Sequence, residues 1–103
     1  MRPILLVQLD KLRPALLLTR ETAVPYLTNI TVAPITSRVR GLASEVAVGR
    51  ANGLEHESVI ACDNVTTIRR ELVVRQIGSL LPPQEWLLAA ALSHAFDLSD
   101  GIT

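Results

Sequence analysis

Two short segments of the chain place polar groups at the ends of apolar runs, in a pattern that suits phosphate binding. Arg13 comes just before the predicted strand Ala15–Thr19, and Thr36 and Ser37 come just after the predicted strand Ile30–Ile35. A guanidinium and two hydroxyls held at rigid strand ends donate hydrogen bonds in a fixed geometry, which phosphate oxygens accept. An arginine that ends a strand in solvent, a threonine that favours a strand and a serine that favours a turn are the alternative explanation.

The loop after Ser37 carries two further cations. Arg38 and Arg40 flank Val39. They are predicted to contact a nucleic-acid backbone, where they would add affinity and salt dependence without selecting a sequence. A solvated turn explains them equally well.

The end of the longest predicted strand, Ser58–Ile68, carries Asn64, Thr66 and Thr67. Their amide and hydroxyl groups are candidates for contacts with base edges, and hydrogen bonding at the strand end is the alternative.

Two residues that lie near Arg13 in the sequence, Asp10 and Lys11, are candidates for assisting Arg13 at a bound phosphate.

Size and charge limit the class of protein. The chain has 103 residues, 49% of them hydrophobic, so we expect one domain over residues 1–103 with one aliphatic core. The formal net charge is zero, but residues 11–50 carry six basic and two acidic side chains, and residues 51–103 carry three and seven. The basic excess coincides with the predicted phosphate-binding segments. Nine of the ten basic residues are arginine, and a coding bias toward arginine and alanine explains most of that number.

Several kinds of site are not expected. Cys62 is the only cysteine and lies in an apolar run, so it is predicted to be a core residue, not a nucleophile. The sequence has no zinc-binding pattern, and neither His56 nor His94 stands beside the other candidates. No metal or cofactor is therefore expected. No segment has the length of a signal peptide or a membrane span, which favours a cytoplasmic protein.

Runs rich in Val, Ile and Leu alternate with turn signals, of which Asn52-Gly53 is the strongest. The spacing predicts a mainly β (α+β) fold, a small and strongly curved antiparallel sheet or barrel with a C-terminal helix. The predicted strands are Ile4–Leu9, Ala15–Thr19, Ile30–Ile35, Glu45–Val48, Ser58–Ile68 and Val73–Leu80.

The predicted helix starts at Pro82-Pro83 and continues through Phe96. Its apolar residues cover a wide arc, which indicates that it is covered on more than one side, as in a dimer. The main stripe consists of Leu88, Ala91, Leu92 and Ala95, broadened by Trp86, Ala89 and Ala90.

The order and spacing of five segments resemble the MazF/PemK-type toxins, ribosome-independent endoribonucleases of bacterial toxin–antitoxin pairs. The matching segments are Arg13–Leu18, Thr31–Ser37, Arg40–Val46, Ser58–Ile68 and Arg75–Gly78. The resemblance implies an SH3-like curved sheet of the CcdB/PemK/MazF kind that forms a homodimer. The chain departs from the family in having only Leu9–Leu12 where members usually have a long loop over the RNA groove, so the groove is expected to be more open.

The resemblance also implies a chemistry. Single-stranded RNA would be cut at a short sequence, without a metal, by attack of the 2′-hydroxyl on the neighbouring phosphorus. Arg13 and Thr36 would be the catalytic residues. The RNA-binding candidates are Lys11, Ser37, Arg38, Arg40, Asn64, Thr66 and Thr67. A cognate MazE-like antitoxin, acidic and partly disordered, would occupy the same groove.

Two other classes of function stay open. A CcdB-like toxin shares this architecture but poisons DNA gyrase by protein contacts, through its C-terminal residues. Here Asp100–Thr103 lack an aromatic anchor, which weighs against that function. A non-catalytic SH3-like interaction module would leave the charge asymmetry unexplained.

Overall fold

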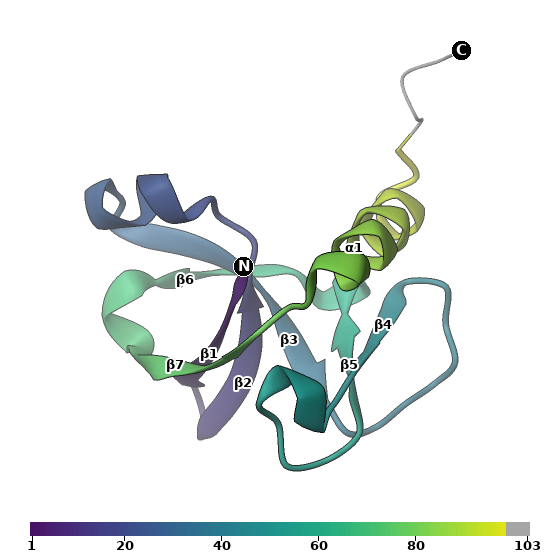
Figure 1. Cartoon of the computed structure of the whole chain (residues 1–103). Coiled ribbons are helices and arrows are strands. Elements are labelled where there is room, and N and C mark those ends of the chain that lie inside the picture. The colour runs from purple at the N-terminus through teal and green to yellow at the C-terminus, as the bar shows by residue number, and fades with distance from the viewer. Residues whose placement is uncertain (99–103) are drawn as a thin grey trace.

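The computed structural model describes residues 1–98, which form seven antiparallel strands and one α-helix (Figure 1). The strands follow the order β4–β5–β3–β2–β1–β7, and β6 pairs with β3 outside this path. The strand bounds are β1 Pro3–Gln8, β2 Leu12–Leu17, β3 Asn29–Thr36, β4 Glu45–Val48, β5 Ser58–Ala61, β6 Thr66–Arg69 and β7 Val73–Ser79. The helix α1 spans Pro82–Ala95. The predicted curved sheet with a C-terminal helix is confirmed.

One predicted strand is interrupted. The segment expected to run as one strand over Ser58–Ile68 is two strands, β5 and β6, separated by the short 3-10 helix η3 (Cys62–Asn64). Both strands pair with β3, since Ile60 faces Ile35 and Thr66 faces Val32. Between these two pairs the chain moves three positions along β3, from 35 to 32, and six positions along the other segment, from 60 to 66. The three extra residues form η3, which bulges away from β3 and turns Asp63 and Asn64 out of the ladder.

Two layers of apolar side chains lie on opposite faces of the curved sheet. One layer packs between the sheet and α1 and is centred on Ile4, Leu16, Ile60 and Leu88. The other consists of Leu5, Val7, Ala15, Leu17, Ile30, Val32 and Ile68, with Val24 and Leu72 packed against it. These two residues belong to the 3-10 helices η1 (Glu21–Tyr26) and η4 (Arg70–Leu72). Alternate residues of a strand point to opposite faces, which explains why neighbouring residues enter different layers.

The start of α1 is fixed by side-chain hydrogen bonds. Gln84 Oε1 accepts a bond from the Leu81 N–H (2.8 Å) and one from Asn52 Nδ2 (2.6 Å). Asn52 is 2% exposed, donates also to the Ser79 carbonyl (3.0 Å) and accepts a bond from the Gly49 N–H (3.1 Å). This network ties the turn after β4 to the end of β7 and to the helix.

No helix within residues 1–98 has both the length and the apolar character needed to cross a membrane.

Candidate active site

A tight hairpin positions Arg13. The turn between β1 and β2 has only three residues, Leu9–Lys11, and the ladder continues up to it, with Val7 opposite Arg13 and Gln8 opposite Leu12. Arg13 therefore lies inside β2, and the prediction that it precedes the strand was wrong. The register with β1 extends β2 by three residues beyond the apolar run. Lys11 lies exposed in the turn itself.

The carboxylate of Asp10 holds the Arg13 side chain. Arg13 Nε donates to Asp10 Oδ1 (2.8 Å) and Nη2 donates to Oδ2 (2.9 Å), a forked ion pair. The hydrogen bonds and charge of Arg13 hold the pKa of Asp10 well below its usual range, and the same bonds raise the pKa of Arg13. Both side chains stay exposed to solvent, so the guanidinium is oriented and still accessible.

The sheet places Arg13 and Thr36 on one face and toward the same end of the neighbouring strands β2 and β3. Ala15 of β2 faces Pro34 of β3, the last pair of that ladder. Arg13 and Thr36 each lie two residues farther along, toward the same end. Because side chains alternate between faces, both point to the face that carries Ala15 and Pro34. Beyond this pair β3 is bonded to β5, with Thr36 opposite Val59. The β2–β3 ladder therefore ends before Arg13 and Thr36, and these side chains lie where the two strands separate.

Thr36 is the last residue of β3, and its hydroxyl has a defined orientation. Thr36 Oγ1 accepts a hydrogen bond from the Arg38 N–H (3.1 Å). Because the oxygen is the acceptor in this bond, its own hydrogen is available to donate to another group. A phosphate oxygen is an acceptor that matches it.

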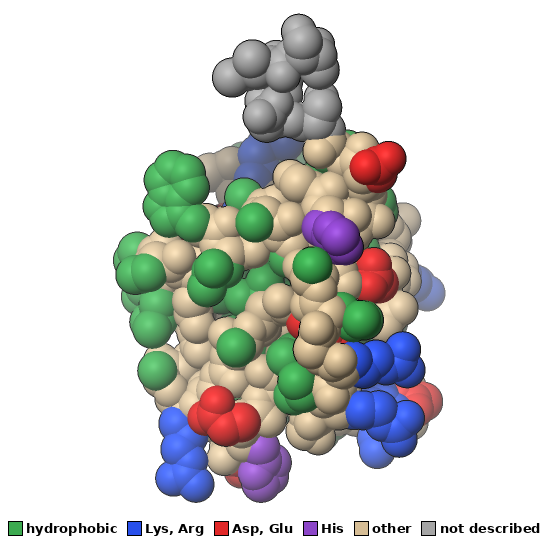
Figure 2. Space-filling model, turned by 90° about the vertical axis from the view of Figure 1, so that its right-hand side faces the viewer, with side chains coloured by type: hydrophobic (Ala, Val, Ile, Leu, Met, Phe, Trp, Pro, Cys, Tyr) green, Lys and Arg blue, Asp and Glu red, His purple; other side chains and the backbone are tan. Residues whose placement is uncertain are grey.

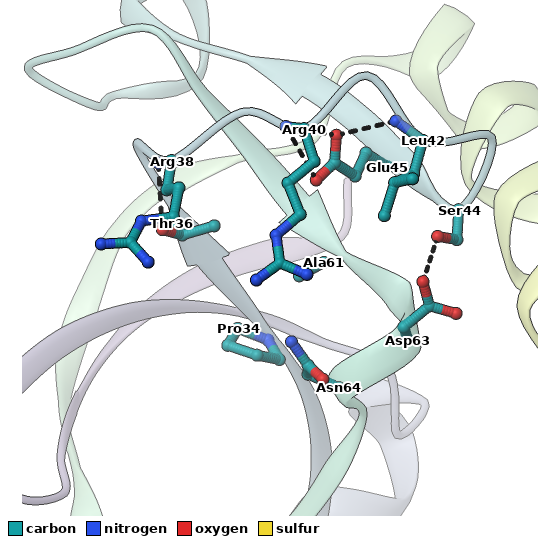
Figure 3. A pocket seen from close by; sticks show the side chains of 10 residues that line it. All are labelled: Pro34, Thr36, Arg38, Arg40, Leu42, Ser44, Glu45, Ala61, Asp63 and Asn64. Atoms are coloured by element: carbon teal, nitrogen blue, oxygen red, sulfur yellow. Dashed lines mark hydrogen bonds between the residues drawn. The ribbon is translucent and has the colours of Figure 1, made fainter.

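A pocket of about 230 Å³ lies beside Thr36 (Figure 3). Its lining combines two guanidinium groups, two carboxylates, an amide and two hydroxyls with three apolar side chains. The lining residues are Pro34, Thr36, Arg38, Arg40, Leu42, Ser44, Glu45, Ala61, Asp63 and Asn64. In Figure 3 the side chain of Arg40 reaches from the loop toward Pro34 and Asn64. The pocket therefore offers both donors and acceptors to a ligand.

The predicted RNA-binding residues fall into two groups. Arg38, Arg40 and Asn64 line the pocket with Thr36, whereas Ser37 and Lys11 are exposed outside it.

The placement of Thr66 and Thr67 at the end of a long strand was wrong, since these residues begin β6 after the interruption by η3. Thr66 pairs with Val32 and Thr67 with Thr31, and neither residue lines the pocket. The Thr67 hydroxyl bonds that of Thr31 (3.2 Å).

Sequence reasoning missed three residues of the pocket, Ser44, Glu45 and Asp63. The Ser44 hydroxyl donates to Asp63 Oδ2, and the Ser44 carbonyl accepts a bond from the Cys62 N–H (3.1 Å), so the loop before β4 is attached to η3. The only local signal was the pair Asp63-Asn64, because both residues favour turns and stand in an otherwise apolar segment.

The remaining titratable candidates lie elsewhere. Cys62 is fully buried, and burial, assisted by the charge of Asp63, raises the pKa of its thiol to about 11, which confirms it as a core residue. No histidine is among the residues that line the pocket. Within residues 1–98 no group of three or more His, Cys, Asp or Glu side chains could hold a metal ion.

Comparison with known proteins decides the family. Residues 3–95 match the PemK-like, MazF-like toxins of type II toxin–antitoxin systems. The chain belongs to this toxin family. It is 59% identical over 98 residues to the endoribonuclease MazF3 of Mycobacterium tuberculosis strain H37Rv, with 95% of each chain covered. It is 33% identical over 88 residues to the probable endoribonuclease MazF5 of the same strain, with 84% of this chain and 81% of the other covered. This MazF-type toxin is thus a homologue of an endoribonuclease.

Solved structures agree with this assignment. The M. tuberculosis toxin MazF-mt6 superposes with a TM-score of 0.93 at 58% identity, covering 95% of this chain and 99% of that one. A mycobacterial endoribonuclease in complex with its cognate antitoxin has the same fold at 19% identity, with a TM-score of 0.83 over 94% of this chain and 93% of that one. The family is that of the expected nuclease toxins. The residues predicted for the gyrase-binding alternative, Asp100–Thr103, lie outside the described part of the chain.

Proposed function

We propose that this MazF-type endoribonuclease cuts single-stranded RNA at a short sequence and leaves a 2′,3′-cyclic phosphate and a 5′-hydroxyl. The observation that carries the proposal is the position of Arg13 and Thr36 on one face and at one end of neighbouring strands, beside a pocket lined by Arg38, Arg40 and Asn64. A cation and a hydroxyl donor on one face of neighbouring strands suit a scissile phosphate. The adjacent pocket suits the nucleotides next to it.

The reaction uses a nucleophile that RNA supplies. The 2′-oxygen forms a bond to phosphorus as its proton is removed, the bond from phosphorus to the 5′-oxygen breaks, and that oxygen gains a proton. The phosphorane between these events carries additional negative charge. The guanidinium of Arg13 is suited to stabilise this charge, and the Thr36 hydroxyl is suited to donate to a non-bridging oxygen.

Asp10 orients Arg13 in this scheme. A carboxylate that already accepts two bonds from a guanidinium, and whose pKa is lowered, is a weak base. Its contribution is to fix the guanidinium before RNA arrives, which reduces the ordering cost of binding. The pocket contains no histidine, so the site differs from that of a two-histidine ribonuclease.

The remaining candidates bind the RNA strand. Arg38 and Arg40 lie on the exposed loop after Thr36 and supply charge for the backbone. The Asn64 amide has donors and an acceptor for a base edge in the pocket. Lys11, Ser37, Thr66 and Thr67 lie outside the pocket, where they would contact flanking nucleotides.

A cognate MazE-like antitoxin is the proposed protein partner, and the cytoplasm is the proposed location. The mycobacterial relative of the same fold was solved in complex with its cognate antitoxin. In this chain the face with Arg13 also carries an apolar hollow of about 230 Å³ between η1 and the sheet, with Leu17, Val24 and Ile30 in its lining and Arg70 at its rim. An acidic segment with apolar anchors matches these features.

The outer face of α1 supports a homodimer. Trp86 is 81% exposed and Leu87 is 56% exposed, and Ala89 and Ala90 on the following turn are also exposed. Figure 2 shows apolar side chains on this side of the molecule. An exposed tryptophan beside small residues on one helix is typical of a surface that packs against another protein. A second copy of the chain is the partner we propose.

The reaction is tested by analysing the product ends. Purified protein is incubated with synthetic single-stranded RNA in EDTA, and the fragments are measured by mass spectrometry. We expect 2′,3′-cyclic phosphate and 5′-hydroxyl ends. Cleavage that requires an added divalent cation, or that leaves 5′-phosphate ends, would contradict the proposed chemistry.

A further inference from the structure

The carboxylate of Glu45 occupies an anion-binding turn in the loop that carries Arg38 and Arg40. Three consecutive backbone N–H groups donate to it, those of Arg40 (3.1 Å to Oε1), Gly41 (2.9 Å) and Leu42 (3.1 Å). Arg40 N is also 3.3 Å from Oε2. Gly41 has a φ of +74°, a left-handed conformation that turns the successive amides toward one point. The Glu45 N–H in turn donates to the Leu42 carbonyl (3.0 Å), which closes the turn.

We propose that Glu45 is a positioning residue for RNA binding, which acts by holding this loop in the conformation that presents Arg38 and Arg40 to the substrate. The inference rests on the proposed function, because it assigns the loop to RNA. It adds a residue whose carboxylate is engaged by the loop backbone and which acts through Arg38 and Arg40, setting how much of the free protein is ready to bind.

The contacts at both ends of the loop support this role. At its start the Arg38 N–H is fixed on Thr36, and at its end Ser44 is fixed on Asp63 and Cys62. The middle of the loop, residues 39–43, is exposed. The amides of residues 40–42 therefore depend on Glu45 for their bonds to protein.

The charges of the loop point to the same role. Within residues 1–98 the side-chain ion pairs are Arg2–Glu85, Arg13–Asp10 and Arg69–Glu71. Glu45 thus binds the loop backbone, and neither Arg38 nor Arg40 is in a side-chain ion pair among these residues. A carboxylate that paired with either arginine would instead weaken its attraction for phosphate.

The expected effect is on binding. If the ordered loop is populated only in part, the apparent dissociation constant rises by the inverse of that fraction. A loop that contacts the RNA backbone binds the ground state and the transition state equally, so KM rises and kcat changes little. Arg13 and Thr36 are expected to act mainly on kcat, which separates the two roles.

The experiment compares Glu45→Ala, Glu45→Gln and wild type. The control is Glu55→Gln, which changes an exposed glutamate outside the pocket. Steady-state cleavage gives kcat and KM, and fluorescence anisotropy gives the affinity for an RNA with a 2′-deoxy scissile nucleotide. Glutamine keeps one acceptor oxygen without the charge. We expect KM and the dissociation constant to rise about tenfold for Glu45→Ala, less for Glu45→Gln and not for the control, with kcat within about twofold.

Two further readouts separate positioning from general damage. Amide hydrogen exchange should show protected N–H groups at residues 40–42 in wild type and rapid exchange there in Glu45→Ala, with the core unchanged. Added formate, compared with chloride at equal ionic strength, should partly restore the affinity of Glu45→Ala by filling the turn. Unchanged KM with wild-type cleavage, a loss confined to kcat, or unchanged amide protection would each overturn the proposal. A wild-type protein that binds no RNA would instead overturn the proposed function on which it rests.

Discussion

At the scale of single residues, the forked pair of Arg13 and Asp10 defines the charge state of the site. Both groups stay ionised at neutral pH. The pKa of Asp10 lies below its usual value near ~4, so the carboxylate is charged above that pH, and the pair breaks only as the pH falls through the lowered value. Arg13, with its raised pKa, stays protonated throughout.

This charge state gives a pH prediction. Between about pH 5 and about pH 9, the dependence of kcat/KM on pH should show no limb that comes from Asp10 or Arg13. Asp10→Asn removes the charge that orients Arg13, so it should lower the whole profile without changing its shape. The profiles of wild type and Asp10→Asn test this by kinetics at constant ionic strength. An acid limb present in wild type and absent in Asp10→Asn would show that Asp10 titrates during catalysis.

Individual residues of the site differ in how far the sequence reveals them. Arg13 and Thr36 were predicted because each stands at the end of an apolar run that reads as a strand. Glu45 and Ser44 were not, because their partners are backbone amides and a residue of η3, which only the folded chain brings near. Asp10 was a candidate by sequence proximity alone, and its forked contact depends on the three-residue turn.

Among the secondary-structure elements, the interruption between β5 and β6 is the feature that the hydrophobic pattern of the sequence does not predict. Residues 58–68 look like one apolar strand, and both halves do pair with β3. At the break, η3 is bonded to Ser44 through Asp63 and Cys62, a contact between distant segments that the local pattern does not contain. The helix was predicted well because Pro82-Pro83 and the apolar stripe are local signals.

The buried network at the start of α1 gives a stability prediction. Asn52→Ala would leave the Gly49 N–H and the Ser79 carbonyl without their partner in a buried site. We expect the free energy of unfolding to fall by about 2 kcal/mol, as is typical for the loss of a buried hydrogen-bonding side chain. Denaturant unfolding measures it. The exposed Asn64→Ala should change stability by less than about 0.5 kcal/mol, and equal effects of the two substitutions would contradict the role of the network.

At the scale of the whole molecule, the exposed apolar face of α1 predicts self-association. Trp86→Glu places a charge on this face and should convert a dimer into a monomer, because an unpaired charge is costly to bury in an interface. Sedimentation velocity at micromolar concentration measures the change. Tyr26→Glu is a matched control, since Tyr26 is also exposed but lies at the end of η1. A monomeric wild type, or a dimer unaffected by Trp86→Glu, would exclude this face.

In the proposed reaction, Arg13 and Thr36 act on the same phosphate. The direct measurement is a double-mutant cycle of single-turnover cleavage rates for wild type, Arg13→Ala, Thr36→Ala and the double variant, with folding checked by circular dichroism. Loss of a donor that stabilises the transition state lowers the rate by roughly 10²–10³. We expect such a loss for Arg13→Ala and a double variant about as slow as the slower single variant, because residues that act as a unit are not additive. Losses that multiply in full, or a fully active Arg13→Ala, would contradict joint action of the two side chains on one phosphate.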